Sequence, residues 1–266
     1  MRLRIAHSTV HRYDPPAAGA IQVLRLTPRN HEGQSVIRWR IDVSADVRLA
    51  AHEDAFGNLT HVFTADGPFE TLSVEIEGEV ETENTDGVVR GAVERFPPSL
   101  FLRETPLTQA DAEIRAFAHD VRGASGGNVL DELHAITQRL HDSVAAGDSS
   151  QNQTDAAEAL ARKSGVARDF AHVLIGAARG LRIPARYVAG YLRGDGAVEQ
   201  DSTHAWAEAF VPELGWVGFD PARGTRPGDA YVRVAIGLDA LGAASVRGAR
   251  YGAGGETLAV AVRVEQ

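Results

Sequence analysis

The chain has 266 residues and contains no cysteine, which excludes disulfide bonds and thiolate metal ligands. No apolar run approaches the roughly 20 residues that a helix needs to cross a bilayer. The first residues, MRLRIAHSTVHRYD, also lack the apolar segment of a secretory signal. We therefore expect no membrane partner, and the sequence favours a cytoplasmic protein.

A run of basic residues is also missing. The chain has 27 Lys and Arg against 36 Asp and Glu, a net charge of −9. Proteins that bind nucleic acid present a basic face to its phosphates, so no nucleic-acid partner is expected. The stretch GASGG lacks the lysine and the preceding strand of a phosphate-binding loop. No cofactor is expected.

Alternation of apolar and polar residues characterises the first part of the chain. Two stretches place apolar side chains on one strand face: Ile37, Trp39, Ile41 and Val43 in the first, and Leu72, Val74, Ile76 and Val80 in the second. This period of two is typical of antiparallel strands with one wet face. Residues 1–85 are therefore predicted to form an N-terminal antiparallel β-sandwich domain.

Helical spacing dominates the middle of the chain. An irregular segment with a Pro–Pro pair, residues 86–107, is predicted to link two domains. Thr108 and Thr154 are the expected first residues of two helices, and a further helix is predicted over about residues 166–181. Strands then return. The order of strands, helices and strands indicates an α+β fold, with residues 108–266 as a core domain of helices on an antiparallel sheet.

Two residues that could carry chemistry lie at the ends of neighbouring predicted strands. His204 opens the predicted strand in THAWAEAFV, Asp220 ends GWVGFD, and the short PELG turn predicts that the strands pair antiparallel. An aspartate beside a histidine can fix its tautomer and leave the other ring nitrogen free as a base. If Val211 faced Trp216, however, the two side chains would lie on opposite faces. The pair therefore needs a register shifted by one residue or a β-bulge; otherwise His204 is a surface histidine and Asp220 starts a turn.

The entrance of the helix after residue 165 has properties that suit a nucleophile. Its unpaired backbone N–H groups and helix dipole would lower the pKa of a cysteine thiol and could stabilise an oxyanion. The residue there is Ala167, which supplies no nucleophile. By spacing alone, Ala167 is a small core residue one turn before Ala171.

Several long motifs give the chain a family resemblance. The stretches GVARDFAHVLIGAARGLRIPARYVAGYL, THAWAEAFVPELGWVGFDP and YVRVAIGLDALGAASVRG resemble the core of the bacterial transglutaminase-like family, part of the papain-like cysteine enzyme superfamily. The stretches LRLTPRNHEGQSVIRWRIDV and DAFGN resemble its N-terminal β-domain. The resemblance covers nearly the whole chain and implies a transglutaminase-like core.

The family's pattern has a catalytic cysteine in GVC-x-DFAH, a histidine in THAW and an aspartate in GWxGFDP. By this resemblance His204 and Asp220 match the histidine and the aspartate, and the cysteine position falls on Ala167. A parent with cysteine there would attack a peptide or protein amide, with His204 as base and acid, and pass the acyl group to water or an amine. The resemblance implies no metal, and the chain as written is expected to be inactive.

Two explanations of Ala167 remain open. The chain is either a transglutaminase-like cysteine amidase or acyltransferase with an engineered Cys→Ala change, or a natural pseudoenzyme that binds a peptide or protein partner in the inactive cleft. A metal held by His172, His204 and Asp220 has no supporting ligand spacing.

Four further residues are expected to support the cleft. Asp169 and His172 are spaced to touch on one helix and are assigned packing or hydrogen bonding. Trp206 and Trp216 are expected to be core residues or cleft walls.

Overall fold

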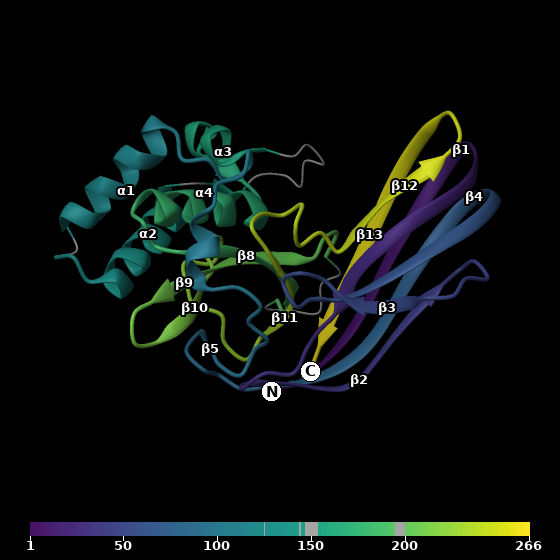
Figure 1. The fold of residues 1–266 in the computed structure, drawn as a ribbon, viewed down its shortest axis with the longest axis horizontal. Helices are drawn as coiled ribbons and strands as arrows, with labels where there is room; N and C mark the ends of the chain where they lie inside the picture. The colour runs from purple at the N-terminus through teal and green to yellow at the C-terminus, as the bar shows by residue number, and fades with distance from the viewer. Residues whose placement is uncertain (125, 144, 147–153, 195–199) are drawn as a thin grey trace.

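The computed structural model describes residues 1–124, 126–143, 145–146, 154–194 and 200–266. A long, folded sheet lies beside a second sheet that is covered by helices (Figure 1). Strands come first, then helices, then strands, so the predicted α+β fold class is confirmed. Within the described residues, no helix is long and apolar enough to cross a membrane.

Two long antiparallel strands, β1 (Arg2–Thr27) and β4 (Leu59–Thr82), form the centre of the N-terminal sheet. Their pairing shifts register between Arg12 and Ala17, where the ladder is interrupted. Such an irregularity lets a strand bend. Both strands therefore run through two halves of one sheet.

Four further strands complete the two halves. Along β4, β2 (Gln34–Val43) pairs with the half that contains Ile76, and β3 (Ala50–Glu53) pairs with the other half. Along β1, β13 (Gly255–Glu265) pairs with the first half of the strand, and β12 (Val246–Tyr251) pairs with the second half. Apolar side chains of both halves meet in one buried cluster: Tyr13, Ala17, Ala20, Leu24, Leu26, Phe63, Ala65, Leu72, Val74 and Ile76. This is the sandwich that alternation predicts.

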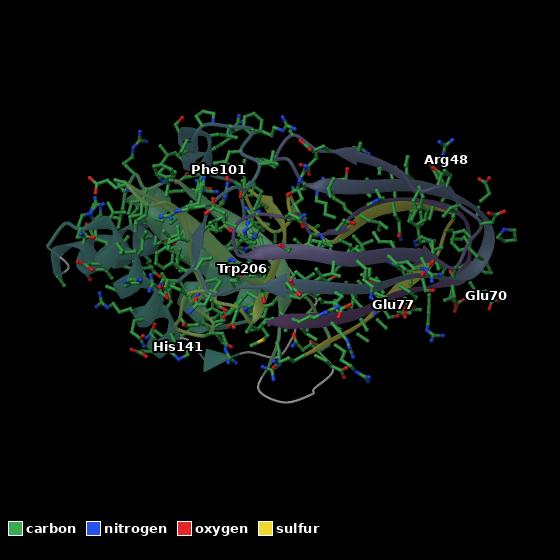
Figure 2. The ribbon with its side chains drawn as sticks, turned by 90° about the horizontal axis from the view of Figure 1, so that it is seen from below. Arg48, Glu70, Glu77, Phe101, His141 and Trp206 are labelled. Atoms are coloured by element: carbon green, nitrogen blue, oxygen red, sulfur yellow. The ribbon has the colours of Figure 1, made fainter. Side chains whose placement is uncertain are left out.

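The outer faces of the N-terminal sheet carry charge. Figure 2 shows Arg48, Glu70 and Glu77 along it, and all three are exposed. Ile37 departs from the predicted pattern, since its side chain is 48% exposed. A register shift between Val36 and Arg38 turns it outward, so the prediction that Ile37 shares a face with Trp39 is wrong.

The C-terminal strands correct the predicted domain limits. Residues 108–266 were expected to form the core domain, yet β12 and β13 pair with β1 at the other end of the chain. Val262 and Val264 pack in one buried cluster with Leu3 of β1 and with the core helices. Alternation shows that a strand has one apolar face, but it does not identify the strand beside it.

The core sheet has the order β11-β8-β9-β10-β5. Its strands are β5 (Val88–Val89), β8 (Ala185–Leu192), β9 (His204–Val211), β10 (Gly215–Phe219) and β11 (Tyr231–Gly237). The short 3-10 helix η1 (Pro98–Leu102) contacts β8. The pair β5 and η1 comes from the segment predicted as a linker, so part of residues 86–107 belongs to the core.

Four α-helices are found among the described residues: α1 (Ala112–Ala124), α2 (Val129–Ser143), α3 (Ala156–Arg162) and α4 (Ala167–Gly180). A two-residue parallel pair, β6 (Ala145–Ala146) and β7 (Ser164–Gly165), lies beside them. The central helix is α4, which is buried on nearly all sides and packs on β8 and β9. The facing side of β9 carries only small residues next to α4: Ala205, Ala207 and Ala209.

Two predicted helix starts are wrong, one by three residues and the other by one residue. Asp111, not Thr108, caps α1 by accepting a hydrogen bond from Ile114 N–H at 2.8 Å. Asp155, not Thr154, caps α3 through Glu158 N–H at 2.8 Å. Both threonines have aspartates within three residues, and a carboxylate accepts a charge-assisted bond at a helix N-terminus. The Thr108 hydroxyl instead accepts from Arg179 of α4 at 2.6 Å.

Two amide side chains attach the N-terminal sheet to β11, the outer strand of the core sheet. Gln34 donates to the Arg233 carbonyl at 2.9 Å and accepts from the Arg233 N–H at 2.7 Å. Asn58 makes the same double contact with Ile236, both bonds at 2.8 Å. An outer strand otherwise exposes unpaired backbone groups. These two clamps satisfy the outward backbone groups of Arg233 and Ile236 and fix β11 relative to the N-terminal sheet.

Replacing Gln34 with alanine is expected to lower the free energy of unfolding by about 2 kcal/mol, because the two clamp hydrogen bonds and a third to the Arg29 carbonyl are lost and β11 keeps an unpaired N–H and C=O. Urea unfolding measures this difference. The matched control is Gln138→Ala, which removes an exposed amide that bonds only within α2 and should change stability by less than about 0.5 kcal/mol. Equal effects of the two changes would show that the clamp contributes nothing.

Candidate active site

The hairpin between β9 and β10 decides where His204 and Asp220 lie. Val211 pairs with Gly215 and Phe219 pairs with Ala207, so the connecting loop is Pro212–Leu214. Gly215 has a φ of +86°, a conformation that glycine adopts freely and that suits a tight hairpin loop. This register is shifted by one residue from the pairing of Val211 with Trp216. Asp220 therefore projects to the same face as His204, as the sequence requires for a pair.

The two side chains are hydrogen-bonded. His204 Nε2 lies 2.6 Å from Asp220 Oδ2. A carboxylate can only accept, so Nε2 carries the proton and Nδ1 remains available as a base. The His204 side chain is 12% exposed and that of Asp220 is fully buried. The free nitrogen thus belongs to a ring that is partly exposed.

Asp220 is held by donors at both carboxylate oxygens. The hydroxyl of Tyr231 donates to Oδ2 at 2.8 Å, the atom that also accepts from His204. The N–H groups of Ala222 and Arg223 donate to Oδ1 at 3.0 and 3.3 Å. The carboxylate is therefore fixed in orientation even though it lies at the end of a strand.

Two aromatic rings enclose the imidazole of His204. The ring of Trp206 stacks on it with centroids 6.3 Å apart, and that of Tyr231 lies 5.8 Å away. Trp206 and Tyr231 also contact each other edge to face at 5.5 Å. Trp206 is 2% exposed, so it is a core residue that forms one wall behind the histidine.

Ala167 is the first residue of α4 and is partly buried. The Asp169 carboxylate accepts from the Val166 N–H at 3.0 Å and from Arg168 Nε at 3.2 Å, which ties the helix entrance together. A Cβ on Gly165 would lie 3.0 Å from the Asp169 Cβ, so glycine there lets the carboxylate approach. The helix thus begins sharply at residue 167.

Asp169 and His172 have separate partners, although their spacing allows contact. His172 is fully buried, accepts from the Ala240 N–H at Nε2 (3.1 Å) and packs against the ring of Tyr187. Burial lowers the pKa of His172 to about 4, so the ring is neutral near pH 7. It is a packing and acceptor group of α4.

Trp216 packs against a buried charge network that the sequence motifs do not indicate. The guanidinium of Arg186 lies 3.9 Å from the centre of the Trp216 ring and bonds Glu208 at 2.7 Å. Arg233 bonds the same carboxylate at 2.7 Å, and Arg186 also holds Glu94 of the predicted linker. Burial disfavours the charge on Glu208, but the two arginines outweigh it and lower its pKa to about 2. The only sequence signal is that Glu208 shares a strand face with Trp206.

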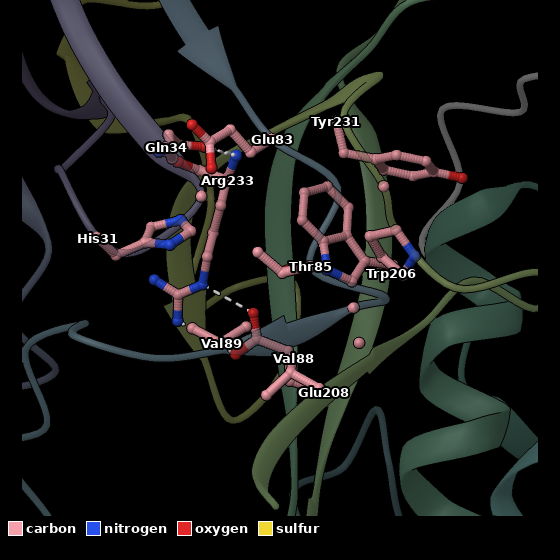
Figure 3. A pocket seen from close by; sticks show the side chains of 15 residues that line it. His31, Gln34, Glu83, Thr85, Val88, Val89, Trp206, Glu208, Tyr231 and Arg233 are labelled. Atoms are coloured by element: carbon pink, nitrogen blue, oxygen red, sulfur yellow. Dashed lines mark hydrogen bonds and ion pairs between the residues drawn. The ribbon is translucent and has the colours of Figure 1, made fainter. Parts of the chain in front are cut away.

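A small cavity of about 40 Å³ lies beside this network, between the core sheet and the N-terminal sheet (Figure 3). Gln34 and His31 line it from one side, and Trp206, Glu208 and Tyr231 from the other. Its lining does not include Ala167, His204 or Asp220. It is therefore a space beside Trp206 and Tyr231 that the His204 side chain does not line. In the described part of the chain, no group of three or more His, Asp or Glu is placed to hold a metal ion.

Comparison with known sequences identifies both parts of the chain. The sequence model of the bacterial transglutaminase-like N-terminal region matches residues 3–81, and that of the transglutaminase-like superfamily matches residues 115–221. Residues 115–221 are thus similar to the transglutaminase-like superfamily. The second match spans α4, β9 and β10, and hence Ala167, His204 and Asp220.

Three relatives illustrate the range of this similarity. An uncharacterised protein of Mycobacterium leprae is 27% identical over 99% of this chain and 98% of its own length. The uncharacterised protein YebA of Bacillus subtilis is 33% identical over 73 residues, 23% of this chain and 10% of its own. A crystal structure from Cytophaga hutchinsonii, described as that of a candidate cysteine protease, is 23% identical and covers 100% of this chain and 90% of its own, with a TM-score of 0.80. That structure shares the fold along the whole chain.

Glu208→Gln is expected to lower the free energy of unfolding by about 3 kcal/mol, because Arg186 and Arg233 would remain buried without their shared counter-charge. Urea unfolding near pH 7 measures the change. Glu213→Gln makes the same substitution in the exposed β9–β10 loop and should have an effect below about 0.5 kcal/mol. A loss at Glu208 no larger than that at Glu213 would rule out the network as a stabilising element.

Proposed function

We propose that this chain has the scaffold of a transglutaminase-like cysteine amidase or acyltransferase, with residue 167 as the position of the nucleophile. The observation that carries the proposal is the buried Asp220 bonded to His204 Nε2, which leaves Nδ1 of a partly exposed ring as a base. This is the arrangement that activates a thiol in Cys–His–Asp enzymes.

The packing of α4 supports a position of residue 167 near this base. Burial raises the pKa of Tyr187, and the charges of Arg168 and Asp169 at the α4 entrance also act on it. Tyr187 pairs with Ala207, which is three residues from His204 along β9. Three residues of a strand span roughly 10 Å. α4 also packs on β9, the strand that begins with His204, which supports residue 167 as a neighbour of the base.

With a thiol at residue 167, the chemistry would proceed in two transfers. Nδ1 of His204 takes the thiol proton, and the thiolate attacks the carbonyl carbon of a peptide or protein amide. Backbone N–H groups at the start of α4 are suited to stabilise the oxyanion. As the C–N bond breaks, the imidazolium gives its proton to the leaving amine and an acyl thioester remains. Water or a second amine then attacks the thioester and regenerates the thiol.

The chain with Ala167 supports a second candidate function. Without a nucleophile, the cleft can bind an amide-bearing peptide or protein but cannot form the thioester. An engineered Cys→Ala change and a natural loss of the cysteine give the same protein. The codon in the source gene separates the two: a cysteine codon supports the enzyme, and an alanine codon supports the binding protein.

Ala167→Cys is expected to create a thiol that iodoacetamide alkylates roughly tenfold or more faster than free cysteine near pH 7, because the helix entrance and His204 favour the thiolate. Mass spectrometry of the intact protein over time gives the rate. Ala116→Cys, on the exposed face of α1, is the control and should react at an ordinary rate.

A second change separates activation from simple exposure. In the Ala167→Cys protein, His204→Ala should reduce alkylation toward the rate of the Ala116→Cys control, leaving only the effect of the helix entrance, and abolish any cleavage of peptide amides. If Ala167→Cys reacts no faster than that control, residue 167 is not the position of an activated nucleophile.

A further inference from the structure

Tyr231 makes a contact that the histidine–aspartate pair does not explain. Its hydroxyl donates at 2.8 Å to Asp220 Oδ2, the same oxygen that accepts from His204 at 2.6 Å. Burial, followed by the negative charge of Asp220, raises the pKa of Tyr231, so the phenol keeps its proton. The hydroxyl can therefore act only as a donor toward the carboxylate near neutral pH.

We propose that Tyr231 is the positioning residue of the His204–Asp220 pair, a role that rests on the proposed function of that pair. The backbone N–H groups of Ala222 and Arg223 fix Oδ1, and the Tyr231 hydroxyl fixes Oδ2. With both oxygens held, the carboxylate cannot rotate away from Nε2. Nε2 thus keeps its proton, and Nδ1 stays unprotonated and available to the nucleophile.

The position of Tyr231 is itself set by both sheets. It begins β11, pairs with Leu192 of β8 and packs edge to face on Trp206. Two residues further along β11, the Gln34 clamp holds both backbone groups of Arg233. The N-terminal sheet therefore anchors the strand that carries the hydroxyl. The charged groups that act on Tyr231 are Asp220 and Arg223.

The first experiment uses the chain as it exists and compares Tyr231→Phe with Tyr191→Phe. Each change removes one buried hydroxyl, but the hydroxyl of Tyr191 contacts His7 Nδ1 at 2.9 Å and not the pair. Nitrogen-15 NMR of labelled histidines reports which nitrogen of His204 carries the proton.

Tyr231→Phe is expected to convert His204 from the Nε2–H form to a mixture of tautomers, while Tyr191→Phe leaves it unchanged. Phenylalanine keeps the ring contacts with Trp206 and His204, so the fold is expected to persist. An unchanged Nε2–H signal in the Tyr231→Phe protein would overturn the positioning role.

The second experiment adds Tyr231→Phe to Ala167→Cys. The pH at which the alkylation rate reaches half its maximum should then be higher by about half a unit. The reason is that a poorly held imidazolium stabilises the thiolate less. Turnover of any peptide amide that the Ala167→Cys protein cleaves should show a kcat about tenfold lower, as expected for one lost hydrogen bond, with KM within about twofold.

The two experiments distinguish failure of the proposed function from failure of the positioning role. An ordinary alkylation rate in Ala167→Cys itself contradicts the proposed function, whereas the tautomer measurement judges Tyr231 without any nucleophile. A pH profile and kcat that Tyr231→Phe leaves unchanged in a reactive Ala167→Cys protein would contradict the positioning role alone.

Discussion

The candidate site depends on the hydrogen bond between His204 and Asp220, and a single step of strand register makes that bond. With Val211 opposite Gly215, the loop of β9–β10 is short enough to bring Asp220 to the histidine's face. A β9–β10 loop longer by one residue would place the Asp220 carboxylate on the opposite face of the sheet, where the helices pack. The short loop that ends at Gly215 therefore also determines where the base lies. Tyr231 and two backbone N–H groups then hold the carboxylate in place.

The N-terminal sheet and the core sheet form one unit in physical terms. Leu3 and Val264 of the first share a buried cluster with the core helices, and the chain returns to its own beginning through β12 and β13. A motif that resembles the family's β-domain also has a structural role in this connection. In DAFGN, the Asp54 carboxylate accepts from the Phe56 and Asn58 N–H groups and so presents the Asn58 amide to β11. The N-terminal sheet thus supports the strand on which Tyr231 lies.

The sequence is sufficient to predict the α+β class, the alternating strands and α4, because each depends on local periodicity. It also sets the condition under which His204 and Asp220 meet, but the choice of register lies in the φ angles of a short loop, which the motif does not specify. Pairing between strands far apart in the sequence is the main feature that the sequence does not predict. Nothing in the alternation of β13 identifies β1 as its partner. The roles of Gln34, Glu208 and Tyr231 could not be inferred either, because each depends on which residue from a distant segment lies opposite.

The most direct test of the proposed site is a crystal structure of the Ala167→Cys protein, with the distance from the introduced Sγ to His204 Nδ1 as the measured quantity. A Cys–His–Asp site predicts that this distance is within hydrogen-bond reach, roughly 3–4 Å, while Nε2 keeps its contact with Asp220 Oδ2. A thiol directed away from the imidazole, or an imidazole whose Nδ1 faces the protein interior, would contradict the assignment of residue 167 as the position of the nucleophile.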